Sequence, residues 1–136
     1  MKRESSLTYK WFDQVWNKGN EAAIDELLDE QASIHGIEGI TEKGSAGFKV
    51  FHSNFLKEFS NLAVNIGEVV AENGMESCHC DVTATQISSG RTVHFTGQTI
   101  VKIENGKIME SWNNFDFLFM YQQLGFALRS EAMPMG

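Results

Sequence analysis

Three short turn signals divide the C-terminal half of the chain, and their spacing is the feature that most constrains the fold. They are "ENG" at 72–74, "SSG" at 88–90 and "ENG" at 104–106, and they separate four runs rich in Val, Ile and Thr. An Asn-Gly pair is a strong hairpin signal because both residues tolerate a positive φ. We therefore expect a four-stranded antiparallel meander from Leu62 onward.

The first half of the chain has helical periodicity instead. Apolar residues recur three and four positions apart from Ser6, within "EAAIDELL" at 21–28, and from Ser45 onward, where Phe48, Phe51, Phe55 and Phe59 share one face. A short strand, "ASIHG" at 32–36, is expected before the third helix. The pattern predicts an α+β fold, with three N-terminal helices packed on a curved mixed or antiparallel sheet and a short C-terminal helix after Asp116.

Length and charge exclude several classes of protein. The 136 residues suit a single domain, 1–136, and no run approaches the ~20 apolar residues of a membrane helix. The net charge of −7 would repel a phosphate backbone, so we expect no nucleic-acid partner. Cys78 and Cys80 lie two apart, which in a strand is too far for an easy disulfide. With no apolar leader at the N-terminus, these free thiols predict a cytoplasmic protein.

Two stretches of the chain resemble a known family. "WNKGNEAAIDELLDEQASIHG" at 16–36 and "IVKIENGKIMESWNNFD" at 100–116 resemble the SnoaL-like polyketide cyclases of the nuclear transport factor 2-like superfamily. The resemblance implies a cone-shaped α+β barrel that binds a small, mostly apolar, oxygenated ligand without a metal or organic cofactor. It implies either acid/base catalysis, as a cyclase, isomerase or hydro-lyase, or a non-catalytic ligand-binding or dimerisation module. It also implies a homodimer formed through the outer face of the sheet.

Strand alternation predicts which residues face the ligand. Pairing Ile103 with Ile108 across the last turn places Thr99 opposite Trp112 and Phe95 opposite Asp116. The resemblance implies that this face lines the cone. Together with positions matched in relatives, it predicts a ligand pocket that includes Phe12, His35, Thr99, Trp112 and Asn114.

The candidate catalytic residues are Asp116, His79 and Asp81. Asp116 stands where the SnoaL-like cyclases keep their acid, and the resemblance places His79 and Asp81 on the cavity side of the strand "ESCHCDVTATQ". An aromatic cone would raise the pKa of an acid by desolvation, and a protonated histidine beside it would lower that pKa again. Groups of this kind suit general acid/base chemistry near pH 7.

Simpler readings remain open for the same residues. Asp116 can be the N-cap of the helix that follows it, and His79 with Asp81 can be a buried structural pair. A zinc site at "CHC" is disfavoured, because alternation separates the two sulfurs from His79. Ketosteroid isomerases keep polar catalytic groups where this chain has Phe12, Gly36 and Thr99, and epoxide hydrolases keep an acid at Asn114 and an arginine at His79. Both of those chemistries are therefore disfavoured.

Overall fold

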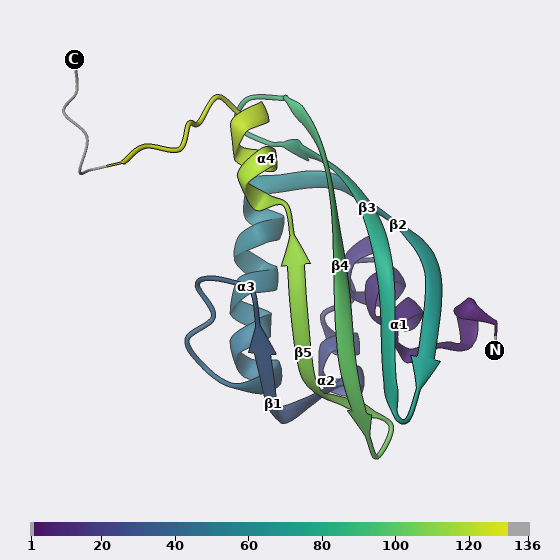
Figure 1. The fold of residues 1–136 in the computed structure, drawn as a ribbon. Coiled ribbons are helices and arrows are strands. Elements are labelled where there is room, and N and C mark those ends of the chain that lie inside the picture. Colours follow the sequence, from purple (N-terminus) through teal and green to yellow (C-terminus); the bar gives the residue numbers. More distant parts are fainter. Residues whose placement is uncertain (1, 131–136) are drawn as a thin grey trace.

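The computed structural model describes residues 2–130 as a curved sheet with helices packed against one of its faces (Figure 1). This confirms the predicted α+β fold, although the sheet stays open between its two edge strands. The strands are β1 (Leu28–His35), β2 (Phe59–Glu72), β3 (Met75–Gln86), β4 (Thr92–Glu104) and β5 (Lys107–Phe115). The helices are α1 (Leu7–Lys10), α2 (Ala22–Leu27), α3 (Gly44–Glu58) and α4 (Phe117–Gln123), with a 3₁₀ turn η1 (Arg3–Ser5) and a π-helical segment η2 (Trp11–Asn17).

The four C-terminal strands form the predicted meander. The strand order is β1-β5-β4-β3-β2; β1 runs parallel to β5, and every other neighbouring pair is antiparallel. Asn73–Gly74 and Asn105–Gly106 both have positive φ at the two turn positions, as the Asn-Gly signals predicted. The parallel β1 makes the sheet mixed and places the end of β1 beside the second half of β5.

A bulge in β5 overturns part of the predicted register. Ile103 pairs with Ile108 as expected, but Lys102 pairs with Glu110, so Met109 is an extra residue. Because an inserted residue reverses the alternation beyond it, Thr99 lies opposite Asn113 and not Trp112. The prediction that Trp112 and Asn114 face the cavity was therefore wrong: both are exposed on the outer face of the sheet, and Trp112 is 38% exposed.

The predicted orientation of β3 was also wrong. Cys78, Cys80 and Val82 are buried toward the helices, whereas His79 and Asp81 lie on the outer face. Cross-strand partners share a face, and the buried residues of β3 lie opposite buried residues of β4. The physical reason is burial of apolar surface: from Ser77 to Thr85, β3 alternates small apolar side chains with polar ones, and the apolar set faces the core. Cys80 and Val82 are therefore not part of the outer face of the sheet.

The first helix changes its winding where it meets the sheet. After α1 the chain continues as η2, in which the amide of Lys18 donates to the carbonyl of Asp13, five residues back, at 3.0 Å. Residues five apart in an α-helix lie about 140° apart around the axis, at 3.6 residues per turn. An i→i+5 helix brings them close to the same side. Trp11 and Trp16, five positions apart, therefore both face the interior of the fold.

Candidate functional site

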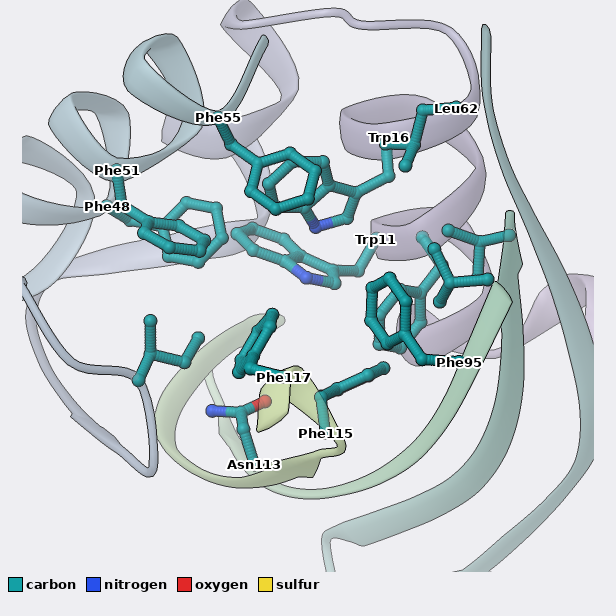
Figure 2. A pocket seen from close by; sticks show the side chains of 14 residues that line it. Trp11, Trp16, Phe48, Phe51, Phe55, Leu62, Phe95, Asn113, Phe115 and Phe117 are labelled. Carbon is teal, nitrogen blue, oxygen red and sulfur yellow. The ribbon is translucent and has the colours of Figure 1, made fainter. Parts of the chain in front are cut away.

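A cavity lined mostly by aromatic residues, the aromatic cavity, lies between the helices and the concave face of the sheet (Figure 2). Its volume is about 60 Å³, and nine of its fourteen lining residues are aromatic. A dry cavity that holds one benzene measures roughly 150 Å³. Side chains must therefore shift to admit an aromatic ligand. The lining residues are Trp11, Phe12, Trp16, Ile37, Phe48, Phe51, Phe55, Leu62, Val64, Val82, Phe95, Asn113, Phe115 and Phe117.

The α3 wall of the cavity is an aromatic stripe that packs on η2. The ring of Trp16 meets Phe48, Phe51 and Phe55 edge to face, with centroids 5.5–6.0 Å apart. His52 on the same helix is buried, and its Nε2 lies 2.8 Å from the carbonyl oxygen of Val15. Since a carbonyl only accepts, Nε2 carries the proton and joins α3 to η2. His52 is thus a buried histidine that packs α3 on η2.

The opposite wall is set by a glycine and by the docking of α4. Phe115 lies across Gly97, and a Cβ at that position would overlap its ring. β5 ends opposite Gly97. Beyond that point the side-chain amide of Gln123 bonds to the backbone of β4. It accepts from the amide of His94 at 2.9 Å and donates to the carbonyl of His94 at 2.8 Å. These bonds fix α4 against β4, and Phe117 of α4 completes the cavity wall.

Asn113 is the polar centre of this otherwise apolar cavity. Its Nδ2 donates to the carbonyl oxygen of His35 at 3.0 Å and to Oγ of Ser111 at 3.1 Å. Its Oδ1 accepts from the hydroxyl of Thr99 at 2.9 Å. The backbone carbonyl fixes the amide orientation, because only the NH₂ group can face it. Both N–H groups are used, so what Asn113 can offer a ligand is the second lone pair of Oδ1.

The three candidate catalytic residues do not come together in the cavity. Asp116 is the exposed N-cap of α4, where its carboxylate accepts from the amide of Phe119 at 3.0 Å, so the capping reading is confirmed. His79 and Asp81 lie on the outer face, where Asp81 approaches His94 at 3.7 Å. Among the described residues that line the cavity, none has an ionisable side chain that titrates near neutral pH.

The predicted pocket residues are divided between the two faces of the sheet. Phe12 lines the cavity, and Thr99 is 2% exposed and reaches it through Asn113. The side chain of His35 instead lies outside, 2.7 Å from a carboxylate oxygen of Glu110 and stacked on Trp112 at 5.7 Å. Only the main-chain carbonyl of His35 takes part in the site.

Sequence reasoning missed Asn113, Trp11 and Trp16 as pocket residues. The inward orientation of Asn113 could not be predicted, because it depends on the bulge at Met109 and no turn residue marks that bulge in the sequence. The two tryptophans stand five apart, a spacing that indicates one shared face only when the helix is π-helical. Their spacing was therefore the available signal, but an α-helical reading places only one of them in the pocket.

The two buried thiols of β3 form a pair of their own. The Sγ atoms of Cys78 and Cys80 lie 3.8 Å apart. The hydrogen bond from Cys80 lowers the pKa of Cys78, while that bond and burial raise the pKa of Cys80 far above its ordinary value. Within residues 2–130 no three His, Cys, Asp or Glu side chains gather as metal ligands. No helix of that part of the chain is long and apolar enough to cross a membrane.

Comparison with known proteins agrees with this architecture. The family model of the SnoaL-like polyketide cyclases matches residues 6–124. The chain therefore belongs to the SnoaL-like polyketide cyclase family. Among curated proteins, none is similar enough in sequence to match.

Solved structures share the fold over nearly the whole chain. TsrD from Streptomyces laurentii is 20% identical, with a TM-score of 0.77 over 88% of this chain and 92% of that chain. IdmH from Streptomyces antibioticus is 19% identical, with a TM-score of 0.74 over 91% and 99% of the two chains. A SnoaL-like polyketide cyclase from Agrobacterium tumefaciens is 16% identical, with a TM-score of 0.72 over 92% and 100%. At these identities the likeness is one of fold.

Proposed function

We propose that this protein binds a neutral, mostly apolar small molecule that carries oxygen, within the aromatic cavity. The observation that supports this most is the lining itself, which is aromatic or aliphatic except for Asn113. Burying apolar surface contributes roughly 25 cal/mol per Å². No described lining residue is charged, so an ionised ligand would lose its hydration without gaining a counter-ion.

Acetophenone and benzoate form a matched pair of probes for this proposal, because they share a ring and differ in charge at pH 7. Acetophenone should raise the thermal unfolding midpoint in proportion to its occupancy, and benzoate should not. Equal stabilisation by both probes would contradict the proposal.

A pair of valines tests whether binding occurs in this cavity. Val82→Phe should fill the space and abolish binding, whereas Val70→Phe, at a position that is 69% exposed, should leave binding intact. Circular dichroism of both variants would show that they remain folded. Loss of binding in Val70→Phe, with Val82→Phe unaffected, would place the ligand elsewhere.

One observation favours a catalytic role in addition to binding. Asp116 lies in the chain between Phe115 and Phe117, which both line the cavity, so its backbone adjoins the cavity wall. We propose that it serves there as a general base toward a proton beside a carbonyl group. Deuterium exchange at the methyl group of acetophenone, followed by NMR in D₂O, would report such proton removal.

Asp116→Asn isolates this chemistry, since asparagine caps a helix about as well as aspartate. Exchange accelerated by the wild type and abolished in Asp116→Asn would support the base. Equal exchange in both proteins would leave a binding protein without this catalytic step.

A further inference from the structure

The indole N–H groups of Trp11 and Trp16 are the unused donors of the cavity. Both side chains line it, and Figure 2 shows the nitrogen-bearing edges of both rings turned toward its interior. Trp11 is only 8% exposed. Neither indole nitrogen donates a hydrogen bond to any atom of the described residues, although a largely buried tryptophan usually finds an acceptor.

The indole N–H of Trp11 faces the cavity. Among the described residues, no side-chain nitrogen or oxygen is both sealed from solvent-sized probes and unpaired. The unpaired Nε1 of Trp11 is therefore not sealed, and Figure 2 shows it turned toward the cavity. Trp11 lines the aromatic cavity and also a second cavity of about 20 Å³. Phe48 and Asn113 line both cavities as well. An N–H that faces the cavity and has no protein acceptor is free to donate to an oxygen atom of a ligand.

The π-helical winding of η2 presents both donors. Trp11 and Trp16 stand at i and i+5, the spacing that an i→i+5 helix aligns. His52 stabilises this segment by donating to the carbonyl of Val15, and its ring lies 4.9 Å from that of Trp16. The edge-to-face contact of Trp11 with Phe48, at 4.8 Å, holds the other indole. Neither indole is free to turn its N–H to the solvent without breaking these contacts.

We propose that Trp11, assisted by Trp16, is the specificity-determining residue that donates to a carbonyl oxygen of the ligand. This inference rests on the proposed binding function. The donors on η2 and the side-chain acceptor of the described lining residues, Oδ1 of Asn113 on β5, lie on different walls of the cavity. The pocket therefore selects a ligand that carries a carbonyl oxygen toward η2 and, toward β5, a hydroxyl group. A hydrocarbon of the same shape leaves both indole donors and the second lone pair of Asn113 Oδ1 without a partner.

The test compares two probes of the same shape, acetophenone and α-methylstyrene, in which a CH₂ group replaces the carbonyl oxygen. Selectivity is the Kd of α-methylstyrene divided by the Kd of acetophenone. Replacing Trp11 with β-(3-benzothienyl)alanine keeps the bicyclic shape and removes the N–H. The same replacement at Trp112, on the outer face, is the control.

The replacement at position 11 should lower the selectivity about fivefold, the value of one net hydrogen bond, and leave the Kd of α-methylstyrene unchanged. The replacement at position 112 should change neither constant. Unchanged selectivity at position 11, with both probes still bound, would overturn the role of Trp11 while leaving the binding function intact. Failure of both probes to bind the wild type would instead overturn the binding function itself.

Discussion

Asn113 and Asn114 are identical neighbours on opposite faces of the sheet, and they allow the register of β5 to be tested by stability alone. Asn113→Leu keeps the branched shape of the side chain and removes three hydrogen bonds, to the carbonyl of His35, to Ser111 and from Thr99. At about 0.5–1.5 kcal/mol each, their loss amounts to roughly 1.5–4.5 kcal/mol. The added apolar surface offsets part of this, so we expect a net destabilisation of about 2–3 kcal/mol.

Asn114→Leu is the matched control. The Asn114 side chain is exposed and makes no hydrogen bond to another described residue. We therefore expect its free energy of unfolding to change by no more than about 0.5 kcal/mol. Urea denaturation measures both variants; with a slope of about 2 kcal/mol/M, the midpoint for Asn113→Leu should fall by about 1 M at unchanged slope. Equal midpoints, or a larger loss in Asn114→Leu, would refute the bulge at Met109 and the site built on it.

Three further predictions follow from other parts of the fold. Glu76 is buried and accepts from the amide and hydroxyl of Thr8 at 2.8 and 2.6 Å. Glu76→Ala should therefore lower the free energy of unfolding, measured by urea denaturation, by about 2–4 kcal/mol. A decrease below about 0.5 kcal/mol would contradict the role of this carboxylate. Cys80→Ala removes the hydrogen bond that lowers the pKa of Cys78. The pH profile of Cys78 alkylation should therefore move to higher pH. An unchanged profile would show that Cys80 does not stabilise the thiolate of Cys78. We also propose a homodimer through the outer face of the sheet, where Trp112 is exposed. Trp112→Asp should therefore weaken self-association, measured by sedimentation velocity. If the wild type sediments as a monomer, the dimer is excluded.

The sequence predicted the architecture because its signals are local. Asn-Gly pairs fix the hairpins at 73–74 and 105–106, and helical periodicity marks α3, so the meander and the helices were recognisable without tertiary information. The N-cap reading of Asp116 was open for the same reason, since the cap depends on residues next to it in the chain.

The site was harder to predict because it depends on which way each strand faces. In β3, the alternation of Cys78, Cys80 and Val82 with polar residues was sufficient to identify the buried face, and positions carried over from relatives led to the opposite assignment. In β5, one extra residue at Met109 reverses every side chain beyond it. Aromatic residues on both faces of β5 leave its pattern ambiguous, so only the paired strand reveals the bulge.

We propose that the ligand binds in the concave aromatic cavity of Trp11 and Trp16, and not on the outer face of the sheet. The chain contains three tryptophans, so an ¹H–¹⁵N spectrum resolves one indole N–H signal for each, and three Trp→Phe variants assign them. Titration with acetophenone should shift the signals of Trp11 and Trp16 and leave that of Trp112 in place. A shift confined to Trp112 would contradict the account.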